Sequence, residues 1–336
     1  MRTMPAEWEP QSGVLLAWPH EKTDWSENLL ETEQCYRKII GAISEREKVF
    51  LLTHDVDATR KKLDDLNLDN ILLINADYDD TWARDFGPIT VTENGEIILL
   101  DFKFNGWGEK FDAQKDNRIN KALQQTLFKG VKTEDHNQFV LEGGSIESDG
   151  KGTILTTSHC LIAENRNQPK TREEIQNYLL KSLGAERIIW LEYGWLEGDD
   201  TDGHIDTLAR FCNETTIAYV KCDDHKDSHY HDLRDMENEL KELVDLNGRP
   251  YQLIPLPMPS PVYAPDGRRL PSTYANFLII NGAVLMPVYN CEQDDLALQQ
   301  MVSAFPDHDI IGINCLPLIL QHGSLHCVTM HLPKGI

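Results

Sequence analysis

The chain has 336 residues, 40% of them apolar, and its 55 acidic residues outweigh its 32 basic residues to give a net charge of −23 at neutral pH. This length and apolar share support a substantial buried core and argue against disorder. The negative charge argues against a nucleic acid or an anionic membrane as partner, because both are bound through basic surfaces; it suits a cationic ligand, or simply an acidic soluble protein.

No stretch approaches the ~20 apolar residues of a membrane helix, and Glu7 and Glu9 stand where a secretory signal would be basic and then apolar. We therefore expect a cytoplasmic protein without membrane contact. Seven cysteines without a C-x-x-C pair predict reduced thiols rather than a disulfide framework or a four-cysteine zinc site. Because no linker or low-complexity tract divides the chain, we expect one domain over residues 1–336.

Apolar, strand-like runs recur along the chain, beginning near Ile71, Gln138, Ile188, Tyr251 and Ile310 at intervals of 67, 50, 63 and 59 residues. Each run leads through a loop rich in glycine or acid to a second strand-like run, and the spacing of apolar residues predicts helices over 171–183 and 232–246. Five such units suggest radial repetition, as in propellers. The alternative is an ordinary α/β sandwich. Unusual polar residues occupy the loop in four units, so we expect those loops to meet at a common centre.

The first of these loops contains Trp82, Arg84 and Asp85, followed by a Gly-Pro turn and an apolar strand. A carboxylate next to an aromatic ring is suited to bind a planar cation, since its oxygens accept paired N–H donors while the ring covers the carbon stem. The alternative is that Arg84 and Asp85 form ordinary ion pairs at the strand start.

In the second and third loops, Glu142 precedes two glycines, and His204 and Asp206 stand two residues apart at the expected start of a strand. Residues i and i+2 of a strand share a face, so the histidine could transfer a proton beside a carboxylate that holds a cation. Glu142 could accept a hydrogen bond from His204 and fix the orientation of its ring. The alternative for the His-x-Asp pair is a solvated strand entrance.

The last loop carries Cys327, which follows Gly323 and Ser324 near the start of a final strand. A thiol placed there could be presented to a pocket, and a cysteine with a histidine is the usual pair for thiolate catalysis, because the thiolate is the attacking species. The alternative is an inert cysteine of the core.

Taken together, these motifs resemble the agmatine deiminase family, a branch of the guanidine-modifying pentein superfamily. The resemblance spans nearly the whole chain, through MPAEWEPQSGVLLAWP, TWARDFGP, FKFNGWG, LEGGSIESDGKGTILTT, ENRN, GDDTDGHID, RRLPSTYANFLIINGAVLMP and GSLHCVT.

The resemblance implies an α/β fold in the form of a five-bladed pseudo-symmetric propeller with the active site on its central axis. It implies hydrolysis of agmatine to N-carbamoylputrescine and ammonia, in putrescine biosynthesis, without a metal or cofactor. The residues that it implies are Cys327 as nucleophile, His204 as general acid and base, Asp85 and Asp206 as guanidinium ligands, Glu142 as support for His204, and Trp82 in the pocket. Asp200 is our choice for the primary amine of agmatine, ahead of Asp199 and Asp202. A homo-oligomer is compatible with the sequence.

Two departures from the family pattern bear on substrate choice. His322 stands where the family usually has a glycine, and Asp202 replaces a common asparagine. Peptidyl-arginine deiminase, free-arginine deiminase and amidinotransferase remain alternatives within the fold. An arginine enzyme should offer a basic residue near the pocket, for which Arg268 and Arg269 are the candidates.

Two further classes remain open. A zinc hydrolase could use His322, His326, Cys327 and His331, although the intervening Gly-Ser predicts a loop rather than the helix that this spacing requires. A non-catalytic polyamine-binding protein would leave the cysteine, histidine and aspartate set unexplained.

Overall fold

The computed structural model describes all 336 residues, and its 17 strands form five small sheets. The sheet β17-β2-β3-β4 consists of Met330–Pro333, Gln11–Ala17, Lys48–Thr53 and Ile71–Asn75. The sheet β1-β5-β6-β7 consists of Arg2–Thr3, Ile89–Glu93, Glu96–Lys103 and Lys132–Val140. The three-stranded sheets are β8-β9-β10 (Ile146–Ser148, Thr153–Thr157, Arg187–Leu191), β11-β12-β13 (Ala209–Asn213, Thr216–Lys221, Gln252–Pro257) and β14-β15-β16 (Leu278–Ile280, Ala283–Val288, Asp309–Asn314).

Ten helices accompany these strands: α1 Leu29–Ser44, α2 Val56–Lys62, α3 Ala83–Phe86, α4 Gly106–Glu109, α5 Ile119–Thr126, α6 Ser158–Leu161, α7 Arg172–Leu183, α8 Tyr230–Glu242, α9 Asp294–Ala304 and α10 Leu316–Ile319. Four 3-10 turns are η1 Leu68–Asn70, η2 Asp116–Arg118, η3 Gly143–Ser145 and η4 Ile205–Thr207. None of the helices combines the length and the apolar character that crossing a membrane demands.

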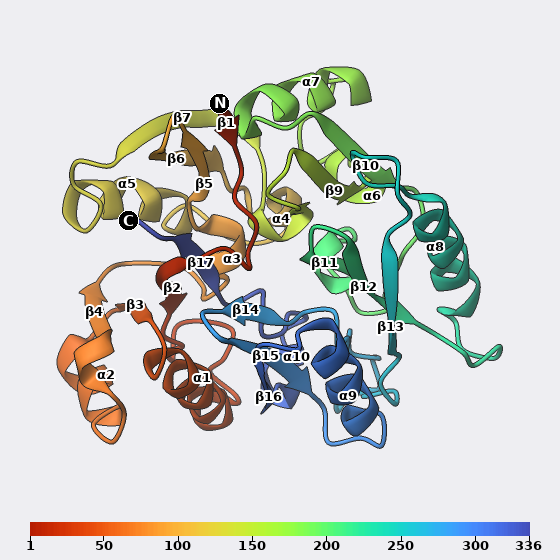
Figure 1. Cartoon of the computed structure of the whole chain (residues 1–336). Helices are drawn as coiled ribbons and strands as arrows, with labels where there is room; N and C mark the ends of the chain where they lie inside the picture. Colours follow the sequence, from red (N-terminus) through yellow and green to blue (C-terminus); the bar gives the residue numbers. More distant parts are fainter.

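One unit recurs in the sheets: an antiparallel pair, a helix, and a third strand parallel to the second. The unit is β5-β6-α5-β7, β8-β9-α7-β10, β11-β12-α8-β13 and β14-β15-α9-β16. The helix supplies the long connection that a parallel pair requires. Figure 1 shows the five sheets arranged in a ring.

The two ends of the chain join neighbouring sheets. β17 pairs antiparallel with β2 in the sheet that contains β3 and β4, and β1 pairs antiparallel with β5 in the next sheet. In the first sheet β17 thereby takes the place of the missing hairpin strand, so the C-terminal segment completes a unit whose other strands begin the chain (Figure 1).

The recurrence read from the sequence corresponds to one strand in each sheet, namely β4, β7, β10, β13 and β16. Each is a parallel edge strand, and the loop after it crosses to the first strand of the next sheet. In the expected unit of strand, loop, strand and helix, the first strand therefore belongs to one sheet and the second strand to the next. The sequence could not show this, because period-two alternation marks strands but does not show which strands pair. β7 also begins at Lys132, before the apolar run at Gln138.

The two expected helices differ in how well the sequence defines their ends. α7 occupies Arg172–Leu183, where Thr171 and Glu174 form a reciprocal capping box and Gly184 ends the helix at φ 68°. α8 ends at Glu242, short of the expected Leu246, because Leu243 adopts an extended conformation and Val244 forms a bridge with Pro250. The apolar pattern therefore runs past the hydrogen-bonded end of α8.

The capping box of α7 provides a test of local stability. Thr171→Ala removes the side-chain acceptor of the Glu174 amide and should lower the free energy of unfolding by about 1 kcal/mol in urea titrations. Activity should be unchanged because α7 contributes no residue to the pocket described below. Thr171→Ser keeps the acceptor and is the matched control, so equal losses in both variants would contradict this account.

Candidate active site

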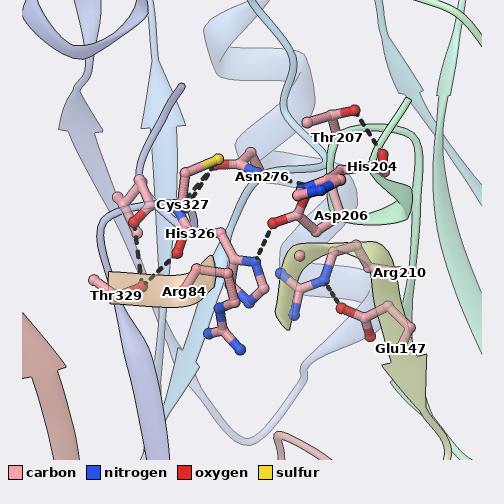
Figure 2. A network of polar contacts seen from close by, with 12 residues as sticks. Arg84, Glu147, His204, Asp206, Thr207, Arg210, Asn276, His326, Cys327 and Thr329 are labelled. Atoms are coloured by element: carbon pink, nitrogen blue, oxygen red, sulfur yellow. Dashed lines mark hydrogen bonds and ion pairs between the residues drawn. The ribbon is translucent and has the colours of Figure 1, made fainter. Parts of the chain in front are cut away.

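The five crossover loops all carry polar side chains toward one region of the molecule. These loops span residues 76–88, 141–145, 192–208, 258–277 and 315–329. In that order they contribute Asp85; Glu142 and Gly144; His204 and Asp206; Asn276; and His326 and Cys327. Figure 2 shows His204, Asp206, Asn276, His326 and Cys327 in this region. The expected convergence of loops is therefore present, and the fourth loop, for which the sequence suggested no catalytic residue, contributes Asn276.

A pocket opens onto this region and is rich in acid and aromatic side chains. Its lining residues are Asp24, Asp80, Trp82, Asp85, Trp107, Phe111, Asp200, Thr201, Gln321, His322, Gly323 and Cys327. Four of them are aspartates and none is lysine or arginine. Such a lining attracts cations and repels anions. Of the residues chosen from the sequence, Cys327, Asp85, Trp82 and Asp200 line the pocket, whereas His204, Asp206 and Glu142 are fully buried.

Cys327 lies in a turn three residues before β17 and is only 4% exposed. The Oδ1 atom of Asn276 accepts from the backbone N–H groups of His326 at 2.9 Å and Cys327 at 3.3 Å, and it lies 3.4 Å from the Cys327 Sγ. Asn276 thus fixes this turn from a different loop. Burial, together with the charges of Asp206 and Asp85, raises the pKa of the Cys327 thiol well above its usual value. Without a ligand, the thiol is therefore protonated at neutral pH.

Asp85 is held by two neutral donors. Its Oδ2 accepts from the indole Nε1 of Trp107 at 2.9 Å, and its Oδ1 accepts from the backbone N–H of Gly144 at 3.0 Å. Burial raises the pKa of Asp85 to about 7, and the nearby charge of Glu142 adds to this shift although the two donors oppose it. The sequence motif FKFNGWG contains Trp107, but nothing in its spacing indicated this contact.

Asp206 has one free oxygen atom. Its Oδ2 lies 2.7 Å from the Nδ1 of His326, while its buried Oδ1 has no hydrogen-bond partner (Figure 2). Burial and the neighbouring Asp85 raise the pKa of Asp206 well above its usual value. Two buried carboxylates side by side cannot both be charged at low cost unless a cation lies between them.

His204 lies at the N-cap of the 3-10 turn η4 rather than on a strand, so the expected geometry was wrong in detail. Its Nδ1 is 3.7 Å from the Oδ1 of Asp85, and neither ring nitrogen has a hydrogen-bond partner. Burial lowers the pKa of His204 well below its usual value, and the charge of Arg166 contributes to the shift. The ring is therefore neutral in the unliganded site.

Gly144 explains how these side chains meet. A Cβ atom at this position would lie 2.6 Å from the His204 Nδ1 and 3.0 Å from both the Asp206 Oδ2 and the Asp85 Oδ1. The three polar groups therefore converge on one hydrogen-sized space in the backbone, which only glycine provides.

The expected hydrogen bond from His204 to Glu142 is not formed, which corrects that prediction. The Glu142 Oε1 lies 2.8 Å from the Nε of Arg166, and Arg166 also binds the Oδ2 of Asp202 at 2.9 Å. A guanidinium attracts a buried carboxylate more strongly than a neutral imidazole does. The pKa of Glu142 is nevertheless raised, because the effect of burial exceeds the opposing effect of the Arg166 charge. Arg166 belongs to the quoted motif ENRN, but its partner is 24 residues away in the sequence.

The acids of the third loop have separate roles. Asp200 lines the pocket, and burial raises its pKa to about 6. Asp199 accepts from Thr201 and Gly203 within its own turn. Asp202 binds Arg166 and, at 2.7 Å, the Nζ of Lys110. Only Asp200 of these three can therefore face a pocket ligand directly.

The pocket lining also includes His322, which stands where the family usually has a glycine. Its ring Nδ1 lies 2.6 Å from the Gly198 carbonyl oxygen, and its Nε2 lies 3.1 Å from the Nη1 of exposed Arg268. Neither Arg268 nor Arg269 lines the pocket, and Arg269 instead pairs with Asp227 at 2.7 Å. Gly323 allows close approach of Trp82, because a Cβ there would lie 2.1 Å from the indole ring.

The four residues considered as a zinc site do not converge. His326 contacts Asp206 and Glu7, His331 contacts Arg84 at 3.1 Å, and His322 contacts Gly198. The one cluster with metal-ligand spacing in the complete chain is Glu142, Cys160 and His204, whose ligand atoms lie within 4.8 Å of one another. Arg166, whose charge lies against Glu142, disfavours a divalent cation in that cluster.

Comparisons with known proteins agree with this geometry. The sequence profile of the Porphyromonas-type peptidyl-arginine deiminases matches residues 3–333. A solved Porphyromonas gingivalis protein, provisionally named arginine deiminase, is 48% identical with a TM-score of 0.95, covering 100% of this chain and 99% of its own. A solved C. jejuni agmatine deiminase, a cysteine-to-serine variant with substrate bound, is 41% identical with a TM-score of 0.94, covering 100% and 97%. A Legionella pneumophila (strain Paris) protein, provisionally named agmatine deiminase, is 36% identical over 99% of this chain and 95% of its own.

The space at Gly144 gives a sharp test of the site. In Gly144→Ala the added methyl group should displace His204, Asp206 and Asp85 together, and a shift of about 1 Å in such a site costs on the order of 100-fold in rate. The measurement is ammonia release from guanidine compounds, with circular dichroism to confirm folding. Gly41→Ala in α1, where the nearest atom to the new Cβ would be 3.4 Å away, is the matched control and should retain full activity. Full activity in Gly144→Ala would refute the arrangement.

Proposed function

The chain belongs to the agmatine deiminase family and is a hydrolase of C–N bonds in amidines, and on that premise we propose that its substrate is agmatine. The products are N-carbamoylputrescine and ammonia, which places the reaction in putrescine biosynthesis. The observation that carries this proposal is the pocket lining of four aspartates without lysine or arginine. Agmatine carries a positive charge at each end, whereas arginine would bring a carboxylate into this acidic pocket.

Free arginine is the second candidate because of one observation. Exposed Arg268 contacts the ring of pocket-lining His322 and could meet a carboxylate at the mouth. The Arg268 guanidinium already pairs with Asp266 at 2.6 Å, which reduces its attraction for a substrate carboxylate and favours agmatine. Peptidyl arginine is a third candidate, because the profile of the Porphyromonas-type peptidyl-arginine deiminases matches this chain.

The proposed architecture is a five-bladed α/β propeller formed by a single domain. The ring of five sheets, the recurrent unit and the closure by β17 support it (Figure 1). The site then lies where the crossover loops of all five blades meet.

Asp85 and Asp206 bind the guanidinium in this proposal. Asp206 offers its unpartnered Oδ1, and the Trp107 and Gly144 donors orient Asp85. Paired N–H donors of a planar cation match such carboxylates and hold its central carbon beside the Cys327 sulfur. Trp82 packs along the ligand stem, and Asp200 receives the primary amine at the other end of the pocket.

The charge of the ligand activates the nucleophile. In the unliganded site, burial disfavours the Cys327 thiolate, and the nearby acids Asp206 and Asp85 add to this effect. A bound guanidinium brings a positive charge next to the sulfur and offsets the effect of these acids, which lowers the pKa of the thiol. Neutral His204 then accepts the thiol proton, so thiolate and imidazolium form only when substrate is present.

The chemical steps follow from these roles. The thiolate bonds to the guanidinium carbon to give a tetrahedral intermediate, His204 gives its proton to the departing nitrogen, and ammonia leaves a covalent thiouronium on Cys327. A water molecule then gives a proton to His204 while the water oxygen bonds to the thiouronium carbon. The C–S bond breaks, which regenerates the cysteine and releases the ureido product.

Substitution of the nucleophile tests the covalent mechanism. Cys327→Ser should abolish ammonia release from agmatine while preserving fold and substrate binding, because the serine hydroxyl is far less acidic than the thiol. Wild-type activity should be higher with agmatine than with free arginine or an arginine peptide. Cys222→Ser, at a buried thiol outside the pocket, is the matched control and should stay active. Turnover by Cys327→Ser would refute the covalent step, and preference for arginine would refute the substrate.

The pH dependence of kcat/KM reports the ionisation of Asp85. Its pKa of about 7 means that the carboxyl is neutral below that pH and cannot pair with a guanidinium. The value of kcat/KM should therefore fall as pH falls through about 7, approaching tenfold per pH unit. Well above pH 7, where the wild-type carboxyl is ionised, Asp85→Asn should lower kcat/KM by an amount corresponding to about 2–5 kcal/mol, and this deficit should shrink as the pH falls below about 7. Asp200→Asn is the comparison and should keep the limb near pH 7; a flat profile in the wild type would contradict the assignment.

A further inference from the structure

A buried histidine next to the nucleophile lies between two carboxylates. The Nδ1 of His326 is 2.7 Å from the Oδ2 of Asp206, and its Nε2 is 2.8 Å from the Oε2 of Glu7. His326 and Asp206 are at most 1% exposed and Glu7 is 6% exposed. Both contacts have hydrogen-bond length, so each must contain a proton.

The proton between His326 and Glu7 belongs to the histidine. Glu7 accepts from the backbone N–H of Ile279 at 2.8 Å and pairs with Arg84 at 3.1 Å and Arg210 at 3.0 Å. Although burial opposes it, these cations and His326 lower the pKa of Glu7 well below its usual value. Glu7 is thus ionised, and the Nε2 of His326 carries the hydrogen that binds it.

The second proton has two possible owners. Either Asp206 is a neutral carboxylic acid that donates to a neutral His326, or His326 is an imidazolium between two carboxylates. Burial and Asp85 favour protonated Asp206 in the unliganded site, while burial, Arg210 and Arg84 favour neutral His326. The ionisable groups facing this pair are Asp85, Arg84, Glu7, Glu147, Arg210, His331 and Cys327.

We propose that His326, held by Glu7, is a positioning residue that takes the proton of Asp206 when a guanidinium binds and returns it when the product leaves. This inference rests on the proposed function, in which Asp206 is a guanidinium ligand. The proton moves from the Asp206 Oδ2 to the His326 Nδ1 across a contact that already exists. Asp206 becomes a carboxylate and His326 an imidazolium, so no proton is exchanged with solvent.

The relay solves an electrostatic problem of the site. Asp85 and Asp206 must both be negative to hold a guanidinium, yet two adjacent buried charges are costly in the unliganded site. With the relay, the second charge appears only when the cation arrives. Glu7 then stabilises the imidazolium, and the N-terminal segment of the chain thereby acts on the ligand through two hydrogen bonds.

The relay predicts a proton count. In the Cys327→Ser background, agmatine binding is followed by calorimetry in buffers of different ionisation enthalpy, between about pH 6.5 and 8.5. In Cys327→Ser/His326→Gln the amide cannot take up a proton, so Asp206 must release it to solvent. The double variant should release up to one proton more per agmatine than Cys327→Ser alone, because release from Asp85 is common to both and cancels. Its affinity should also rise with pH more steeply.

His331→Gln in the same background is the matched control. This histidine also faces Glu7, at 3.3 Å, but it makes no hydrogen bond with Asp206, so its replacement should leave the proton count unchanged. Equal counts in all three proteins would overturn the relay.

A second measurement does not require the His326 variant to bind ligand. Ring ¹⁵N shifts of histidine-labelled Cys327→Ser protein should show His326 changing from neutral imidazole to imidazolium when agmatine is added. An imidazolium in both states, or a neutral ring in both, would overturn the relay even if the enzyme is active. Absence of ammonia release from agmatine, arginine and arginine peptide by the wild type would instead overturn the proposed function, and the relay with it.

Discussion

The arrangement of the site depends on the burial of several carboxyl groups in one water-poor region. Asp85, Glu142 and Asp206 are almost or fully buried, and burial raises the pKa of each. A fixed cation, Arg166, neutralises Glu142, whereas Asp85 has only the neutral donors Trp107 and Gly144. Glu142 therefore has a compensating cation within the protein, whereas Asp85 has none. An uncompensated buried carboxylate favours the binding of a cation.

The ring of sheets meets this constraint by bringing one crossover loop from each unit to the same place. No single loop could supply an acid pair, a histidine, an amide and a thiol within hydrogen-bond reach. Asn276 illustrates the benefit, because its side chain fixes the Cys327 turn while its Nδ2 donates to the Asp206 carbonyl oxygen at 3.3 Å. Backbone and side chains of three loops are locked together through one amide (Figure 2).

Some features were predictable because their causes are local. α7 follows from a capping box and an apolar period within twelve residues, and short apolar runs marked the positions of β4, β7, β10, β13 and β16 but not their pairing. Asp85, His204 and Cys327 stood out because their residue types suit one chemistry. Asn276 did not, and His326 was considered only as a zinc ligand, because an amide and a second histidine gain meaning only from the groups that they contact. Glu142 was correctly expected near His204, but its partner Arg166 was missed.

The sequence by itself determined the acidic character, the recurrence of five strand-like runs and the candidates Asp85, His204 and Cys327, because composition, periodicity and residue chemistry can be read from short segments. Periodicity left an α/β sandwich open, and the expected fold class came from the resemblance of the motifs to a known family. Only the tertiary structure decided which carboxylate meets which cation, that Gly144 provides the common space, and that His326 lies between Glu7 and Asp206. Those facts depend on distances between residues up to 319 positions apart and on exclusion of water around them, and neither is encoded in any local pattern.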